Sequence, residues 1–374
     1  MTSALWAQAV WAWLFLSLGW SLRGQFGHLR GALIPGALAA AAIALGRRSE
    51  PWRRAFGWAV VLGAAGFSVG GYFGYGLTIE RIVHAPRVLA AFPDLARIFW
   101  TGAVWGGFGA TALGFGFSEQ PWRFRDGVVY GLLGAVGLLI LGVLKAEAYD
   151  LWVVGAALVA LQVYNARCKR SRIISLFGAA GVAGFGGGFL LAALLLHAGH
   201  RQWFGTGWPW WHLRDQILGG CGGIALAWAS HTAARLGLAP APRPAGGWGW
   251  RIGLAWYLAG IPLMNALGVV DSWIEERPIA SLDTLRILRT GLVWGFVVLA
   301  IGLVRRFASS RHPAPPRALR DATIAVIWFL SAAAIAKEMV PLGWARWEPA
   351  FTLFLIYSAM LTILLVRYPL EEQP

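Results

Sequence analysis

Long apolar stretches recur along the whole chain and are separated by short polar loops. They lie near residues 4–20, 31–46, 56–79, 98–118, 127–144, 151–166, 173–196, 216–233, 252–270, 291–304, 322–344 and 350–366. A helix needs ~20 mostly apolar residues to cross the hydrocarbon core of a bilayer, and these stretches are close to that length. The pattern predicts an all-α, polytopic integral membrane protein of about 12 transmembrane helices. The first stretch follows no basic residue and precedes no small-residue cleavage site, so it predicts a span and not a signal peptide.

Composition supports this class of protein. Of the 374 residues, 58% are hydrophobic and 13% are charged, and the mean hydropathy is +0.60. Soluble domains usually carry ~25% charged residues, which excludes a water-soluble globule. The net charge of +15 comes from basic residues dispersed through short loops, a pattern that does not favour a nucleic-acid partner. Arginine outnumbers lysine 29 to 3, and with abundant Ala, Gly and Trp this is typical of a bacterial protein.

The loops divide into two sets by charge. Those on the side of the N-terminus hold 19 basic and 6 acidic residues; they are 46–55, 119–126, 167–172, 234–251, 305–321 and the C-terminal tail. The opposite loops hold 12 basic and 10 acidic residues. Cytoplasmic loops carry the excess of Lys and Arg. The bias predicts a multi-pass protein of the bacterial inner membrane, with both termini in the cytoplasm.

A repeat is visible in the sequence. Residues 97–106 and 286–295 agree at seven of ten positions, at a separation of 189. Four further matches lie in the same order: His28-Leu29-Arg30 with His212-Leu213-Arg214, Glu80-Arg81 with Glu276-Arg277, Arg125-Asp126 with Arg320-Asp321, and Lys145-Ala146-Glu147 with Lys337-Glu338. Together they predict a tandem duplication into an N-terminal six-helix repeat, residues 1–170, and a C-terminal six-helix repeat, residues 171–374. Repeats of equal orientation occur in secondary transporters, which bind substrate between the halves.

This architecture resembles the major facilitator superfamily. The loop L-G-R-R-S-E-P-W-R-R at residues 45–54 is similar to the basic loop of that family, although the acidic member of its D-R-x-G-R-R motif is absent. The resemblance implies a 6+6 helix secondary transporter. It carries over no residue role.

Ionisable residues near membrane spans are costly and mark candidate sites. We expect positive charge for substrate binding from His28, Arg30, Lys145, His212, Arg214 and Lys337. We expect coupling or gating from Glu80, Arg81, Glu147, Asp215, Glu276, Arg277 and Glu338. The alternative for Arg30 and Arg214 is an anchor at the headgroup level, or a local ion pair; for Glu80-Arg81 it is a salt bridge. No motif calls for a cofactor or a metal, although His197-x-x-His200 leaves a metal or haem reading open.

Three functions remain open at this point. The first is a secondary transporter that moves an anionic or sugar-like small solute through a central cavity between the two repeats. The second is an integral membrane transferase or hydrolase acting on a lipid-linked substrate at a periplasmic site, with His28, His84 or His212 as the base. In that case Trp208 to Trp211, in the tryptophan-rich loop at residues 203–211, hold the substrate. The third is an assembly subunit without a site. The pattern favours the transporter over an enzyme, and it leaves the oligomeric state open.

Overall fold

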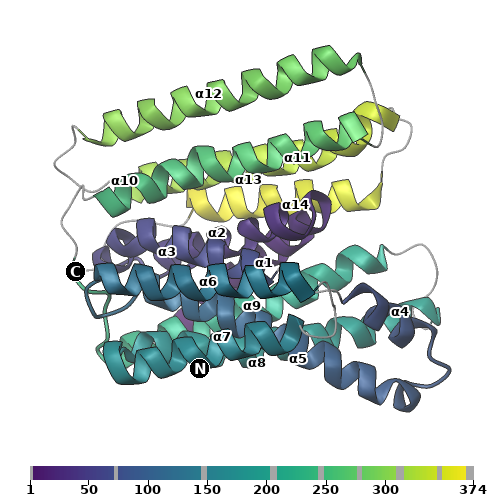
Figure 1. Ribbon diagram of the computed structural model, residues 1–374, viewed down its shortest axis with the longest axis horizontal. Helices are drawn as coiled ribbons and strands as arrows, with labels where there is room; N and C mark the ends of the chain where they lie inside the picture. The colour runs from purple at the N-terminus through teal and green to yellow at the C-terminus, as the bar shows by residue number, and fades with distance from the viewer. Residues whose placement is uncertain are drawn as a thin grey trace.

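The computed structural model describes residues 3–70, 75–144, 150–202, 209–242, 248–275, 280–308, 316–342 and 348–367. Within these ranges the chain is helical almost throughout and contains no strand (Figure 1). Its helices are α1 (Ser3–Phe26), α2 (His28–Gly46), α3 (Glu50–Gly70), α4 (Gly76–His84), α5 (Phe92–Gly116), α6 (Phe124–Leu144), α7 (Asp150–Tyr164), α8 (Arg172–His200), α9 (Trp210–Arg235), α10 (Trp248–Ala255), α11 (Ile261–Glu275), α12 (Leu282–Ala308), α13 (Pro316–Leu342) and α14 (Pro349–Arg367).

Three short segments complete the described secondary structure. A 3-10 turn, η1 (Val88–Ala91), precedes α5. One π-helical segment, η2 (Asn165–Lys169), extends α7, and another, η3 (Trp256–Gly260), joins α10 to α11 without a break. The long helices therefore number twelve in the described part of the chain, with α10, η3 and α11 counted as one, and α4 is a short thirteenth.

Length and apolar composition identify membrane-spanning candidates among these helices. In the described residues, seven are long and apolar enough to cross a bilayer: α1, α7 with η2, α8, α10 to α11, α12, α13 and α14. A shorter apolar helix covers Arg30–Gly46. A membrane-spanning, all-helical protein is the class that this structure supports.

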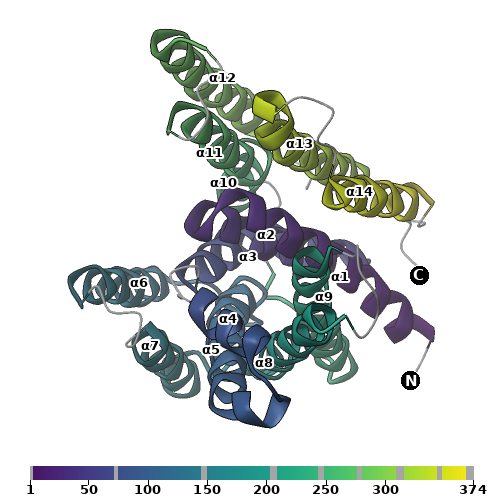
Figure 2. The same ribbon diagram turned by 90° about the vertical axis from the view of Figure 1, so that its right-hand side faces the viewer.

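Six helices close into a ring at the centre of the molecule. Around it α1 packs on α2, α2 on α3, α3 on α5, α5 on α8, α8 on α9, and α9 returns to α1. Figure 2 shows this ring end-on. Its interior is filled by large buried aromatic side chains, among them Trp20, Trp105 and Phe185. The ring is a packed core and not an open channel at these positions.

Glycines allow the helices of the ring to approach closely. A Cβ atom at Gly223 of α9 would overlap the carbonyl of Ala12 in α1, and one at Gly36 of α2 would overlap the carbonyl of Gly63 in α3. The hydrophobic effect does not drive helices together inside a lipid bilayer. Small residues at helix crossings promote association instead, because they let the two backbones pack closely. The glycine-rich stretches of the sequence are therefore packing surfaces here.

The remaining long helices flank the ring on two sides. On one side α6 and α7 pack on each other, and α7 contacts α5. On the other, α10, α11, α13 and α14 form a layer against α1, α2 and α3, and α12 lies outermost (Figures 1 and 2). The side chain of Asp271 on α11 connects this layer to its neighbours, because it binds Arg30 of α2 (2.6 Å) and Arg289 of α12 (3.3 Å).

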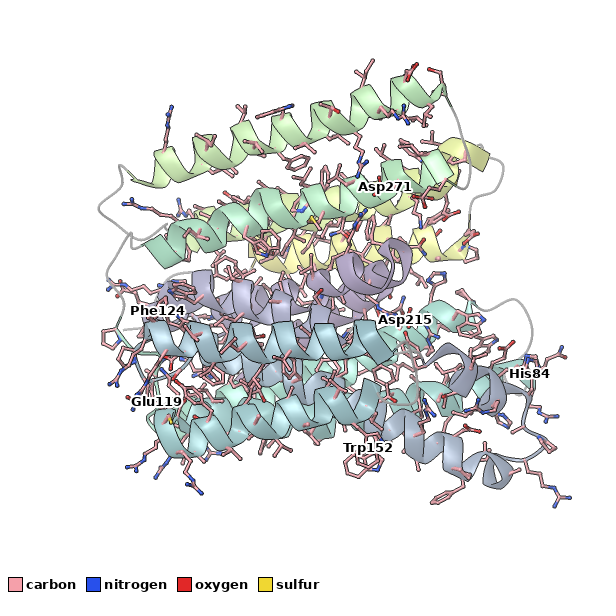
Figure 3. All side chains as sticks on the ribbon, viewed as in Figure 1. His84, Glu119, Phe124, Trp152, Asp215 and Asp271 are labelled. Carbon is pink, nitrogen blue, oxygen red and sulfur yellow. The ribbon has the colours of Figure 1, made fainter. Side chains whose placement is uncertain are left out.

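The two ends of the bundle differ in their polar groups, as Figure 3 shows. At one end, here the Lys169 end, Lys169 donates to the carbonyl of Pro121 (2.7 Å) and Ser118 accepts from the backbone amide of Ala241 (2.9 Å). The loops at 119–126, 167–172 and 234–251, which share the basic charge bias, therefore meet at one end. The other end, here the His84 end, carries His84, Asp215 and Asp271. Which end faces the cytoplasm stays a prediction.

The start of α8 illustrates how the sequence fixes a helix end at the Lys169 end. Ser171 is its N-cap, and the hydroxyl accepts from the amide of Ile174 (3.2 Å). The carboxylate of Glu119, from the loop before α6, accepts from the amide of Arg172 and from the hydroxyl of Ser171 (2.5 and 2.6 Å). A carboxylate at a helix N-terminus satisfies free N–H groups and complements the helix dipole. These contacts join α8 to the α5–α6 loop.

Each of the twelve predicted spans lies on one of the twelve long helices of the described residues, although seven of these are long and apolar enough to cross a bilayer and most extend beyond the predicted bounds, as α12 does by beginning at Leu282. The span predicted at 56–79 is two helices, because α3 ends at Gly70 and α4 begins at Gly76. Glycine has a low helix propensity, and the sequence between them is rich in glycine. The first helix continues past its predicted end at Trp20 to Phe26, which places Arg23 inside a helix.

The predicted halves are interleaved in space. The ring takes α1, α2, α3 and α5 from residues 1–170 and α8 and α9 from the remainder. The most similar segments of the repeat also occupy different environments: Trp105 of α5 is fully buried, whereas its counterpart Trp294 of α12 is 65% exposed. The duplication stays a prediction. The predicted boundary between the halves, near residue 170, does not separate two helix bundles, because both halves contribute helices to the ring.

Candidate functional site

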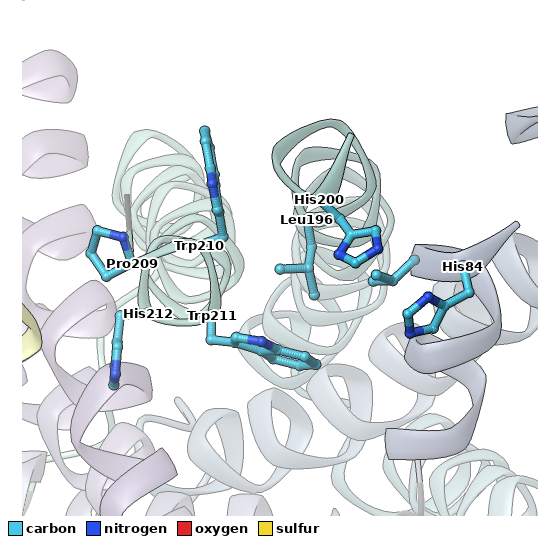
Figure 4. Close-up of a pocket in the computed structure, with 8 residues that line it drawn as sticks. His84, Leu196, His200, Pro209, Trp210, Trp211 and His212 are labelled. Atoms are coloured by element: carbon cyan, nitrogen blue, oxygen red, sulfur yellow. The ribbon is translucent and has the colours of Figure 1, made fainter. Parts of the chain in front are cut away.

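A pocket of about 440 Å³ lies at the His84 end, between the end of α4, the end of α8 and the beginning of α9. Figure 4 shows the residues that line it. They are Val83 and His84 from α4, Leu196 and His200 from α8, and Pro209, Trp210, Trp211 and His212 from the start of α9. Three imidazoles and two indoles thus share one pocket, although His84 comes from a segment more than 100 residues before the others.

Two of the histidines pack edge-to-face on one side of the pocket. The ring centroids of His84 and His200 are 4.8 Å apart, and the ring planes are nearly perpendicular at 81°. Nearby His197 does not belong to this pair, because it is buried and its Nδ1 lies 2.8 Å from the carbonyl oxygen of Ile82. The two histidines of the motif His197-x-x-His200 therefore have different surroundings: His197 is packed between helices, and His200 lines the pocket.

The third histidine lies on the other side of Trp211 (Figure 4). The ring of His212 packs edge-on against Phe354 of α14, with centroids 6.1 Å apart. Among the described residues, no group of three or more His, Cys, Asp or Glu is arranged to hold a metal ion. The pocket offers imidazole groups for proton transfer and an indole face for stacking.

Behind the pocket wall lies a buried ion pair. The guanidinium of Arg214 stands over the ring of Trp211, 4.7 Å from its centroid, and it donates through Nε and Nη2 to Oδ1 of Asp215 (2.8 and 2.6 Å). Both residues are buried in α9. Oδ2 of Asp215 faces the end of α1, 3.2 Å from the position of a Cβ on Gly24.

A second buried arginine completes this inner layer. Arg23, in the last turns of α1, is 4% exposed, and its Nη1 donates to the hydroxyl of Tyr75 (2.6 Å). Its guanidinium carbon lies 5.0 to 5.7 Å from the ring centroids of Trp105, Tyr75 and Trp20. Guanidinium groups are held well by aromatic faces. Gly24, the residue after Arg23, lies against Oδ2 of Asp215, which places the two arginines near each other.

Several predicted substrate-binding residues have partners away from the pocket. Arg30 is held by Asp271, and the Nζ of Lys337 donates to the carbonyl of Gln25 at the end of α1 (2.8 Å). Arg30 and Arg214, matched in the repeat, thus bind different carboxylates. Of the predicted cations, Arg214 and His212 lie at the pocket, and Lys337 lies at the neighbouring end of α1. Glu338 follows Lys337 in α13 and is half-buried.

The predicted gating residues are dispersed at the His84 end. Arg81 pairs with Asp94 at the start of α5 (2.7 Å) and not with Glu80, which is exposed. The hydrogen bond from Arg81 to Asp94 raises the pKa of the Arg81 side chain. This pair is solvent-exposed and contributes little to stability. Lys145, Glu147, Glu276, Arg277 and the side chain of His28 lie outside the described residues, as do residues 203–208 of the tryptophan-rich loop.

Sequence reasoning missed Arg23 and Tyr75 as site residues, and it considered His200 only as a possible metal or haem ligand together with His197. Arg23 follows an apolar run and looks like a loop residue, although it stands in a polar segment, R-G-Q-F-G-H-L-R, that is dense for a span end. Tyr75 stands in the run G-Y-F-G-Y-G, whose glycines signal a backbone turn between helices. Nothing in the local pattern pairs His200 with His84, because the contact depends on how α4 packs on α8.

Comparisons with protein-family models, with curated proteins and with solved structures find no match to this chain. The resemblance to the major facilitator superfamily therefore stays a prediction. The site must be interpreted from its own geometry.

Proposed function

We propose that this chain is a multi-pass membrane enzyme, a transferase or hydrolase that acts on a lipid-linked substrate at the periplasmic face of a bacterial inner membrane. One observation carries the proposal: His84, His200 and His212 share a pocket of about 440 Å³ with Trp210 and Trp211. Imidazoles in a concave site supply general acid–base catalysis, and indole faces hold a sugar ring or a headgroup.

The position of the pocket suits a substrate that stays in the bilayer. It lies at the ends of α8 and α9, and both helices carry exposed apolar side chains below it, including Leu191, Ile224 and Trp228. Acyl or prenyl chains would contact this apolar surface while the polar head enters the pocket. The charge bias of the loops puts the opposite, basic end in the cytoplasm.

The packing of the ring also favours a fixed site over rocking halves. Transport by rigid-body rocking needs two bodies with a separable interface. Here α8 packs on α5 and α9 packs on α1, so two of the extensive helix contacts of the ring join the two predicted halves. Rocking residues 1–170 against residues 171–374 would break these contacts.

Substitution of the pocket histidines tests the enzyme proposal. His84→Gln and His200→Gln are expected to lower turnover at least ~100-fold, because positioned general acids and bases contribute about that much or more. The assay reconstitutes the protein in nanodiscs with phosphatidylglycerol and a polyprenyl-diphosphate-linked sugar, and mass spectrometry follows consumption of either lipid. His231→Gln is the matched control, because His231 lies near the far end of α9. Equal activity in all three variants would exclude the pocket as the catalytic site.

Transport of an anionic solute is the second candidate. It is favoured by the position of Lys337 and the Arg214–Asp215 pair at the end of α1, where Lys337 donates to the carbonyl of Gln25 and Oδ2 of Asp215 lies next to Gly24. In proteoliposomes, a transporter would accumulate solute without altering its covalent structure. Loss of uptake in Lys337→Ala, together with unchanged lipids in the nanodisc assay, would favour this candidate over the enzyme.

A further inference from the structure

The inner layer behind Trp211 has no role in the histidine chemistry proposed above, yet it buries two arginines. Arg23 is 4% exposed and Arg214 is 8% exposed. Charged groups are rarely buried unless they are paired or functional, because desolvation is costly. The two guanidinium groups and Asp215 together carry one net positive charge, and they lie directly behind one wall of the pocket.

The geometry of Arg214 is that of an anion receptor already engaged with an anion. Its Nε and Nη2 form the edge that binds a carboxylate or a phosphate in a fork, and both nitrogens converge on the single Oδ1 atom of Asp215. Asp215 is the next residue in the same helix, so the ion pair is an internal contact of α9, although Oδ2 of Asp215 also lies next to Gly24 of α1. A helix-to-helix brace would instead join two segments, as Asp271 does for α2 and α12.

Trp211 connects the outer pocket with this layer. Its indole lines the pocket and is 54% exposed, and the Arg214 guanidinium is in contact with its ring. The guanidinium is therefore separated from the pocket by one exposed side chain. Arg23 is held next to the same layer by Tyr75, whose hydroxyl accepts its Nη1 hydrogen bond.

We propose that Arg214, supported by Arg23, is a binding subsite for a phosphate or diphosphate group, and that Asp215 occupies the arginine fork when the subsite is empty. The inference rests on the proposed function, because it assigns the chemical class of the group that the histidine pocket would hold. A phosphate entering the fork displaces the Asp215 carboxylate, and the guanidinium exchanges one oxyanion partner for another.

Two neighbouring substitutions are expected to act in opposite directions on phosphate binding. Asp215→Asn removes the competing carboxylate charge and is expected to tighten binding about tenfold, which corresponds to one charge-assisted hydrogen bond. Arg214→Gln is expected to weaken it by about the same factor or more, and Arg214→Lys keeps the charge without the fork and falls between. A purely structural ion pair predicts the same direction for both residues.

The probes separate a soluble phosphate from a lipid phosphate. Isothermal titration of the detergent-solubilised protein with inorganic pyrophosphate measures binding of a soluble phosphate. Native mass spectrometry of the protein in nanodiscs of phosphatidic acid and phosphatidylcholine measures how much phosphatidic acid is retained, and so measures binding of a lipid phosphate. Arg286→Gln is the control, because Arg286 is an exposed arginine of α12 at the same end of the bundle. Binding in either arm that rises in Asp215→Asn and is unchanged in Arg286→Gln supports the subsite.

The results that overturn the inference differ from those that overturn the enzyme. No saturable binding of pyrophosphate or phosphatidic acid by the wild type, or weaker binding in Asp215→Asn, excludes the anion subsite. An equal loss in Arg286→Gln assigns the binding to general surface charge and also excludes it. Both binding measurements are made without turnover, so a failure of the turnover assay alone leaves this binding result intact.

Discussion

Lys169→Met is expected to reduce the free energy of unfolding by about 3–5 kcal/mol, because it leaves a buried carboxylate without its countercharge. The Nζ of Lys169 lies 2.8 Å from Oδ2 of Asp126, and the two side chains are 2% and 0% exposed. The lysine also donates to the carbonyl of Pro121, and Tyr164 donates to Asp126. The pair joins the start of α6 to the end of η2. Unfolding in mixed micelles at pH 7 measures the change.

Two controls separate the ion pair from general damage. The double variant Asp126→Leu/Lys169→Met removes both charges and is expected to recover most of the loss, because apolar replacements of a buried pair are often neutral. Arg320→Met removes a cation from the corresponding pair of the repeat, in which Asp321 is 62% exposed, and is expected to cost less than ~1 kcal/mol. If the double variant is as unstable as the single one, charge is not the cause.

The same pair predicts an acid-dependent loss of stability. Burial by itself raises the pKa of Asp126, but hydrogen bonds from Lys169, Tyr164 and the amide of Arg123 outweigh it and lower the pKa below its usual value. A carboxyl with a lowered folded-state pKa contributes stability above its unfolded value of ~3.9 and loses it as the pH falls through the folded value. As the pH is lowered from 6 to 3, the free energy of unfolding of the wild type is therefore expected to fall more than that of the double variant. A constant difference would contradict this.

Gly223→Leu is expected to prevent the ring from closing and to destabilise the protein by about 3 kcal/mol or more, at the upper end of overpacking effects. A Cβ at this position would overlap backbone atoms of Ala12 and Trp13 in α1, which cannot rotate away as a side chain can. Thermal denaturation of the detergent-solubilised protein, followed by size-exclusion chromatography, measures the loss.

Gly291→Leu is the matched control for this substitution. It makes the same exchange inside α12, where nothing lies within 4 Å of a Cβ, and its melting temperature is expected to equal or slightly exceed that of wild type. Similar losses in both variants would show that helix propensity or insertion, and not the α1–α9 contact, sets the effect of Gly223→Leu.

The sequence was sufficient to predict the helical class and the positions of the long helices. Apolar length determines where a helix can cross a bilayer, and charge bias predicted that the loops 119–126, 167–172 and 234–251 share one end. The end of α1 could not be predicted in this way, because Arg23 is polar by composition and is kept in the helix by Tyr75 and by aromatic rings from other helices. Hydropathy does not register such tertiary contacts.

The candidate site could be predicted only as a set of separate residues. Sequence reasoning placed His84, His212 and the tryptophans of the loop at one end, and the structure brings these two histidines into one pocket with Trp210 and Trp211. It also assigned Arg30 to substrate binding, whereas Arg30 is occupied by Asp271. The repeat suggested equivalence between Arg30 and Arg214, but their neighbours differ because α2 faces α11 and the start of α9 faces the pocket.

The closed ring sets an order for the biogenesis of the protein. Helices enter the membrane in chain order, and domains form from the N-terminus during synthesis. After α7 has left the ribosome, α1, α2, α3 and α5 can form only an open arc, whose gap is filled when α8 and α9 arrive. The surfaces of α1 and α5 that later contact α9 and α8 face lipid or an insertion chaperone in that interval. A nascent chain arrested before α9 is therefore an incomplete fold, and it is the species on which membrane quality control would act.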